Sequence, residues 1–144
     1  MGILRSLASN TTLSALERKL PKVITPAAHS VIDYAHVAFF VTTGLVLWKK
    51  NRRAALASLG TGAFVLVQAL LTDYPGGVLP RISFKTHGRM DAGFASASTV
   101  IPRLMAFDHT PAAEIFHVNS VVEACVVGLT QFDSAEASRQ NAAA

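Results

Sequence analysis

The sequence predicts an all-α fold: an integral membrane four-helix bundle built from two tandem transmembrane hairpins, with a short N-terminal amphipathic helix. Three observations lead to this prediction. Hydrophobic residues make up 51% of the 144 residues and charged residues only 15%, and the mean hydropathy is +0.38, which is too apolar for an ordinary soluble domain. Four apolar stretches alternate with polar links, and a polar motif recurs after 58 positions.

The chain divides into three segments. Residues 1–25 place apolar side chains near helical spacing as far as Ile24, so we expect an amphipathic helix on the membrane surface. Residues 26–133 form the four-span membrane domain. Residues 134–144 are small and polar, and we expect them to form a flexible tail. The two hairpins of the membrane domain cover residues 26–72 and 84–132.

The first hairpin carries the clearer spans. Its first span covers residues 26–48, and its second span, over residues 54–72, has no charged residue in 19 positions. About 20 apolar residues of helix cross a bilayer core. The short link between the two spans is strongly basic, which is typical of a loop at a membrane surface.

The second hairpin is more polar. Its first span, over residues 84–107, carries five ionisable residues and a middle rich in small residues. Small residues let helices approach closely in lipid, so we expect this span to pack against its neighbours or a partner. Pro102 should kink or end it. The second span covers residues 112–132.

A His-x-x-x-Asp motif opens both hairpins. His29 and Asp33 recur as His87 and Asp91, and the Leu-Thr pair that ends the first hairpin returns at the end of the second. Residues four apart lie on one face of a helix, and antiparallel spans return their ends to the side where the hairpin began. The repeat therefore predicts a polar cluster near one membrane face. Its expected members are His29, Asp33, His87, Asp91, Arg89, Asp73, Thr72 and Thr130, with His36 and Glu123 one step deeper.

Three interpretations of this cluster remain open from the sequence. In the structural one, each His-x-x-x-Asp motif forms a local hydrogen-bonded pair and Arg89 neutralises Asp33, Asp73 or Asp91, because buried charges need partners. In the second, the histidines and carboxylates hold a transition metal, or His29 and His87 clamp a haem. In the third, polar side chains that step inward form a proton or ion path. The residues for that path are Asp33, His36 and Glu123.

Several other classes of protein are excluded. Cys125 is the single cysteine, so the chain can form neither an internal disulfide nor a cysteine-based metal site. The basic residues flank apolar spans and form no stripe with interleaved aromatics, so we expect no nucleic-acid binding. The sequence has no phosphate-binding glycine loop and no Gly-x-Ser-x-Gly motif.

Two tandem two-span hairpins resemble small bacterial membrane proteins of the SPW-repeat type. The similarity covers architecture alone, because the Ser-Pro-Trp motif of that family is absent here, and it implies no function or site residue for this chain. It fits the expectation of a protein in the inner membrane of a bacterium.

The sequence favours an accessory or cofactor-holding subunit of a membrane complex. With almost no extramembrane domain, the chain is too small to suggest an independent enzyme. A small transporter or proton-conducting protein is the alternative, and a metal-dependent membrane enzyme is a third. We expect contacts with lipid, and with partner membrane subunits or further copies of the chain.

Overall fold

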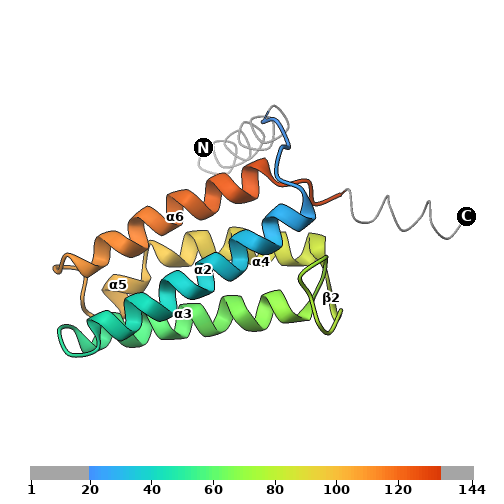
Figure 1. Ribbon diagram of the computed structural model, residues 1–144. Coiled ribbons are helices and arrows are strands. Elements are labelled where there is room, and N and C mark those ends of the chain that lie inside the picture. The colour runs from blue at the N-terminus through green and yellow to red at the C-terminus, as the bar shows by residue number, and fades with distance from the viewer. Residues whose placement is uncertain (1–19, 134–144) are drawn as a thin grey trace, which may run out of the picture.

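The structure, a computed structural model, describes residues 20–133, which are mostly helical and confirm the all-α class (Figure 1). The elements are α2 (Pro26–Leu47), α3 (Arg52–Leu71), β1 (Thr72–Asp73), β2 (Ile82–Ser83), α4 (Phe84–Ser98), α5 (Ile101–Leu104) and α6 (Ala112–Leu129). The expected tail over 134–144 lies outside the described residues.

Most of the expected amphipathic segment also lies outside the described part of the chain. Residues 20–25 are described, and none of them is helical. Ile24 pairs with Thr130 in a parallel β-bridge, with hydrogen bonds from its amide to the Leu129 carbonyl and from the Gln131 amide to its own carbonyl. The prediction that the amphipathic helix extends as far as Ile24 was therefore wrong at this end of the segment.

Polar caps determine where three of the long helices begin. The side chains of Thr25, Asn51 and Ser83 each accept a hydrogen bond from the amide three residues later, which satisfies a donor that the first helical turn leaves free. Pro26 occupies the first position of α2, where a missing N–H has no cost. These caps place the first turns of α2 and α4 firmly, and both turns carry site residues.

Within the described part of the chain, three helices, α2, α3 and α6, are long and apolar enough to cross a membrane. The expected continuous span over 84–107 is instead broken, since α4 ends at Ser98 and the four-residue α5 follows after a turn. Pro102 lies in the first turn of α5, where proline is tolerated, whereas inside a continuous helix it would remove a hydrogen bond. The 15-residue α4 is thus not among the apolar membrane-length helices.

The two halves of the sequence repeat are connected by matching backbone pairings in the structure. Thr72 pairs with Ile82 in the parallel β1–β2 ladder, and Ile24 pairs with Thr130 in the matching bridge. Ile24 and Ile82 are equivalent positions of the two halves, as are Thr72 and Thr130. The strand before each hairpin therefore pairs with the end of the other hairpin. This arrangement brings the beginnings of α2 and α4 and the ends of α3 and α6 to one end of the molecule.

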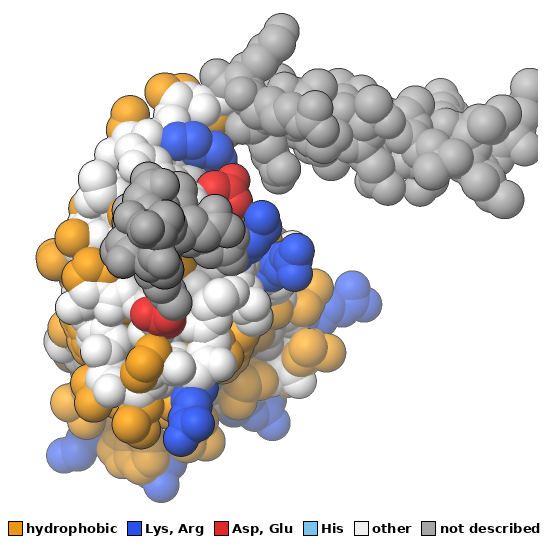
Figure 2. Space-filling model, turned by 90° about the vertical axis from the view of Figure 1, so that its right-hand side faces the viewer, with side chains coloured by type: hydrophobic (Ala, Val, Ile, Leu, Met, Phe, Trp, Pro, Cys, Tyr) orange, Lys and Arg blue, Asp and Glu red, His pale blue; other side chains and the backbone are white. Residues whose placement is uncertain are grey.

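The interior is divided between this polar end and an apolar core at the other end. Phe40, Phe107 and Phe116 are buried there against small residues of α3 and α6. One turn beyond Phe40, Gly44 lets α2 approach α3 closely, because a Cβ atom at this position would lie 2.6 Å from Cγ of Leu59. In Figure 2, which looks onto the polar end, hydrophobic side chains gather on the left and lower sides of the molecule, and Lys and Arg side chains lie at the right and lower edges.

Candidate functional site

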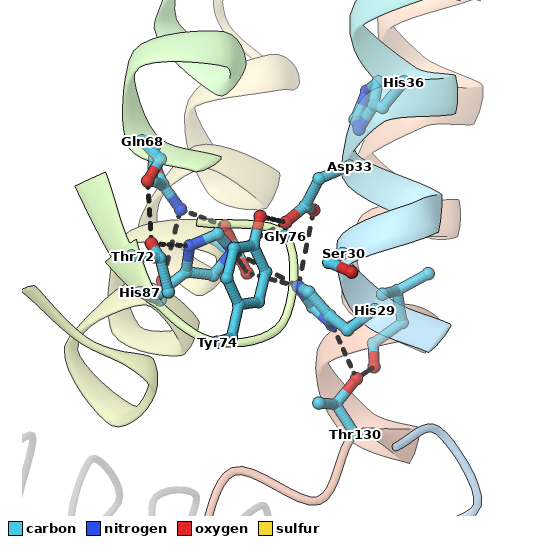
Figure 3. Close-up of polar contacts among 12 residues, drawn as sticks. His29, Ser30, Asp33, His36, Gln68, Thr72, Tyr74, Gly76, His87 and Thr130 are labelled. Atoms are coloured by element: carbon cyan, nitrogen blue, oxygen red, sulfur yellow. Dashed lines mark hydrogen bonds and ion pairs between the residues drawn. The ribbon is translucent and has the colours of Figure 1, made fainter. Parts of the chain in front are cut away.

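The two repeated histidines meet inside the polar end. His29 lies in the first turn of α2 and His87 in the first turn of α4, and both side chains are 0% exposed. Their Nε2 atoms are 3.2 Å apart, and their rings meet edge to face (Figure 3). The sequence predicted both residues on one side of the bundle, and the structure brings them into direct contact.

A threonine hydroxyl determines that Nδ1 of each histidine ring carries a hydrogen. Oγ1 of Thr130 lies 2.9 Å from Nδ1 of His29, and Oγ1 of Thr72 lies 2.7 Å from Nδ1 of His87. Each hydroxyl donates its hydrogen to the backbone carbonyl four residues earlier, at 2.6 and 2.7 Å respectively. A hydroxyl has one hydrogen, so it must accept from the imidazole. Each Nδ1 is therefore protonated, and when both rings are neutral, the Nε2 lone pairs of His29 and His87 face each other.

Two carboxylates flank the Nε2 atoms. Asp33 places Oδ1 3.4 Å from Nε2 of His29 and Oδ2 3.3 Å from Nε2 of His87. Oδ2 of Asp91 lies 3.3 and 3.1 Å from the same two nitrogens. Asp33 and Asp91 are 4% and 5% exposed, so all four groups are withdrawn from solvent. We call these four residues the His/Asp cluster.

Tyr74 and Gln68 hold the carboxylates in place. The Tyr74 hydroxyl donates to Oδ2 of Asp33 at 2.7 Å, and Nε2 of Gln68 donates to Oδ1 of Asp91. Burial, followed by the hydrogen bond to Asp33 and the charge of that carboxylate, raises the pKa of Tyr74 well above its usual value. The phenol is therefore held in its protonated form, the one that donates.

Aromatic rings enclose the histidines. The rings of Phe84 and Phe132 lie 5.2 and 5.5 Å from the ring of His29, and Tyr74 lies 5.4 Å from His87. Phe132 is able to approach because residue 88 is glycine, where a Cβ atom would come within 2.5 Å of the Phe132 ring. Apolar surroundings strengthen the electrostatic interactions inside the cluster.

The separations suit a small metal ion. His29, His87 and Asp33 each offer one ligand atom, all within 4.8 Å of one another. Ligand atoms about 2.0–2.1 Å from a tetrahedral metal lie roughly 3.3 Å apart. The two Nε2 atoms are 3.2 Å apart, and each lies 3.3 or 3.4 Å from a different oxygen of Asp33, so one turn of this carboxylate brings a single oxygen toward both. In addition, Oδ2 of Asp91 is buried without a hydrogen bond from residues 20–133, although both Nε2 atoms are close. An acceptor in this state is suited to a cation.

The haem interpretation does not fit this geometry. Iron clamped between two imidazoles needs two bonds of about 2 Å in opposite directions, with a flat macrocycle between the rings. The Nε2 atoms of His29 and His87 are only 3.2 Å apart, and the carboxylates of Asp33 and Asp91 flank the space between them.

The remaining predicted site residues lie elsewhere. His36 and Glu123 form a separate pair, with Nδ1 3.3 Å from Oε2, about one turn beyond Asp33 on α2. Asp73 is half-buried in β1 beside Thr72. Arg89 is exposed, and the expectation that it neutralises the cluster does not hold, because two residues of helix turn it to the face opposite His87.

Two supporting residues, Gln68 and Tyr74, were missed as members of the site. Gln68 lies one helical turn before Thr72, so the spacing of four residues on a helix already placed both on one face. Tyr74 follows the same threonine by two residues. Its segment has the composition of a turn, and a tyrosine there predicts only an anchor at the membrane interface. Its contact with Asp33 depends on how residues 74–77 fold back over the end of α3.

No known protein family, curated protein or solved structure matches this chain. Its function must therefore be argued from the chemistry of the His/Asp cluster and from the apolar helices that carry it.

Proposed function

We propose that this chain is a small integral membrane protein that holds one divalent transition-metal ion, as a cofactor-holding or accessory subunit of a membrane complex. In this proposal α2, α3, α4 and α6 form a four-helix bundle of two tandem hairpins. The ion is bound by Nε2 of His29 and His87 and by the carboxylate of Asp33, with Asp91 as a fourth ligand or charge partner.

The convergence of the two Nε2 lone pairs is the observation that carries the proposal. Because Thr130 and Thr72 require hydrogens on Nδ1, neutral His29 and His87 turn lone pairs toward each other and toward two carboxylates. Such a set of acceptors is unfavourable unless a cation lies among them. A shared proton relieves part of the repulsion, whereas a divalent metal satisfies every acceptor together.

The charge and the supporting hydrogen bonds point the same way. Two carboxylates and two neutral imidazoles carry a charge of −2, which a divalent ion cancels. Histidines that bind metals typically donate their other N–H, and ligating carboxylates are themselves hydrogen-bonded, as Thr72, Thr130, Tyr74 and Gln68 provide here. Nitrogen and oxygen ligands in a tetrahedral arrangement favour zinc, with manganese and iron as further candidates.

The surroundings favour a held cofactor over an independent enzyme. The residues of the cluster are at most 5% exposed, which leaves no room for a large substrate beside the ion. The three apolar helices support a membrane location, which we place in the inner membrane of a bacterium. The less apolar α4 has small and basic residues on its exposed face, and this face supports contact with a partner subunit or a second copy.

Metal binding is tested directly with the full chain in lipid nanodiscs. After treatment with a chelator and removal of the chelator, Zn²⁺ titrated by calorimetry should bind at one ion per chain, and elemental analysis should recover it. His87→Gln should lose this binding, and His117→Gln, which changes an exposed histidine of α6, should retain it. No binding of Zn²⁺, Mn²⁺ or Fe²⁺ to the parent, or equal binding by both variants, would overturn the proposal.

A second candidate function, proton conduction, is favoured by the His36–Glu123 pair. The pair lies further along the bundle than the cluster, since His36 is about one turn beyond Asp33 on α2. Proton flux into liposomes under a pH gradient, compared between the parent chain and Asp33→Asn, tests this candidate. Flux that the substitution leaves unchanged, or no flux at all, counts against it.

A further inference from the structure

A pocket of about 560 Å³ lies between α2 and α6, apart from the His/Asp cluster. Its walls are mainly apolar, with side chains such as Ile32, Phe39, Val118 and Val122. The volume falls within the range of about 300–1,000 Å³ that is usual for small-molecule sites, which combine apolar walls with a few polar groups. The buried His36–Glu123 pair supplies polar groups of this kind here.

His36 contributes a polar atom without a partner. Its side chain is 10% exposed and that of Glu123 7%. Nδ1 of His36 faces the carboxylate at 3.3 Å, but Nε2 is buried with no hydrogen bond among the described residues. Burying such an atom unsatisfied is costly. Nε2 has almost no accessible surface, so a ligand of the pocket gains this hydrogen bond when the His36 ring turns toward it.

The chemistry of the pair indicates which hydrogen-bonding group the ligand carries. Apolar surroundings favour states in which His36 and Glu123 together have no net charge. Either His36 is an imidazolium beside a carboxylate, or a protonated Glu123 donates to Nδ1 of a neutral imidazole. The other neutral tautomer, with its hydrogen on Nδ1, is disfavoured because the Glu123 hydrogen would lose this acceptor. In both favoured states Nε2 carries a hydrogen. The missing partner of His36 is therefore an acceptor.

We propose that this pocket binds a membrane-dissolved molecule with an apolar body and a carbonyl oxygen, such as a quinone, and that the carbonyl accepts a hydrogen bond from Nε2 of His36. The inference does not depend on metal binding at the His/Asp cluster. It assigns the His36–Glu123 pair to ligand recognition.

Depth separates this ligand from ordinary bilayer lipid. His36 lies ten residues after Pro26 at the start of the 22-residue α2, so it is about 15 Å from that end of the helix at a rise of 1.5 Å per residue. The hydrocarbon core is about 30 Å thick, which places His36 near its middle. Ester carbonyls of bilayer lipids lie at the interface, whereas a freely dissolved carbonyl compound reaches this depth.

A matched pair of probes tests the hydrogen bond. 2-Acetylnaphthalene, labelled with ¹³C at the carbonyl, and 2-isopropenylnaphthalene have the same shape, but only the first has an acceptor. Titrated into nanodiscs containing the full chain, with empty nanodiscs as reference, the ketone should bind saturably, and its infrared carbonyl band should move to lower frequency. A net hydrogen bond of ordinary strength should make the ketone bind about five to ten times more tightly than the alkene.

Three variants complete the test. His36→Phe should abolish the shifted carbonyl band. Val118→Trp should block the pocket and remove binding of both probes, and Val121→Trp should retain it, because Val121 is an equally exposed valine of α6 outside the pocket. The proposal is overturned if the parent shows no saturable binding, if both probes bind equally, if His36→Phe keeps the shifted band, or if the two tryptophan variants behave alike.

Discussion

His29 and His87 lie 58 residues apart in the chain, yet their Nε2 atoms are separated by 3.2 Å. Each turns its Nδ1 atom to a threonine at the end of the other hairpin, His29 to Thr130 and His87 to Thr72. Neither half of the repeat can therefore build the site alone. An ion bound here would connect the two hairpins and, by mass action, stabilise the folded chain over the unfolded one.

The threonine hydroxyls should govern metal affinity through the histidines. Thr72→Val removes the acceptor that holds the hydrogen on Nδ1 of His87. The hydrogen can then move to Nε2, where it would occupy the position of the lone pair that binds the metal. Loss of such a supporting hydrogen bond typically weakens metal binding by about 10- to 100-fold, and we expect this range for Zn²⁺ measured by calorimetry.

Thr99→Val is the matched control for that measurement. Thr99 also donates its hydroxyl hydrogen to a backbone carbonyl, that of Ser96 at 2.7 Å, but it is exposed and distant in the chain from either histidine. Its substitution should leave the affinity for Zn²⁺ unchanged. Equal losses in Thr72→Val and Thr99→Val would show that the hydroxyl acts only on helix stability.

Tyr74 should stay protonated at a pH where ordinary tyrosines ionise. Burial and the hydrogen bond to Asp33 raise its pKa, and a free tyrosine titrates near pH 10. The raised pKa means that the contribution of Tyr74 to stability is complete below about pH 10, the value of the unfolded chain, and is lost as the pH rises above it.

Phenolate absorbance measures this difference. The chain has two tyrosines, so Tyr74→Phe would remove half of the signal if both titrated normally. We expect the parent and the variant to show the same absorbance rise through pH 10 while folded. A rise in the variant half that of the parent would contradict the buried hydrogen bond.

Local patterns in the sequence predicted much of this arrangement. The expected hairpin starts at residues 26 and 84 are the observed first residues of α2 and α4, because the apolar stretches that predicted the spans begin where these helices begin. The spacing of His29 and Asp33, and its recurrence, placed four members of the cluster correctly, since helical periodicity and antiparallel return depend on few assumptions.

Features that depend on packing between segments were less predictable. The contact of Tyr74 with Asp33 arises from the path of a loop, which periodicity does not describe. Arg89 was expected to neutralise the cluster because it lies inside the repeated motif, but nearness in sequence does not put residues two apart on one helix face. The break before Pro102 was expected only as a kink or an end, and its extent depends on how residues 99–111 turn toward α6.

Arg89 should be dispensable for the site. Its side chain is exposed on α4, so Arg89→Ala should change the affinity for Zn²⁺ by less than about twofold, which is within 0.5 kcal/mol. Calorimetry on the variant checks this. A tenfold weaker affinity would restore the interpretation in which this guanidinium neutralises Asp33 or Asp91.

Gly77 should be irreplaceable in the loop that carries Tyr74. A Cβ atom at this position would lie 1.8 Å from the carbonyl oxygen of Thr72, and a backbone atom cannot turn aside as a side chain can. Gly77→Ala must therefore displace the loop from the end of α3, which moves both Thr72 and Tyr74. We expect a loss of about 1–3 kcal/mol in the free energy of unfolding, the usual cost of overpacking, together with weaker Zn²⁺ binding.

Gly60→Ala provides a control of opposite sign. A Cβ atom on Gly60 of α3 would meet nothing within 4 Å, and alanine is favoured over glycine inside a helix by about 0.5–1 kcal/mol. When all three proteins are unfolded with denaturant under the same conditions, Gly60→Ala should therefore be more stable than the parent and Gly77→Ala less stable. Gly77→Ala could instead match the parent in both unfolding and Zn²⁺ binding. The loop would then have moved enough to accept the new methyl group while the cluster stayed intact. That result would show that the loop does not position Tyr74 and Thr72.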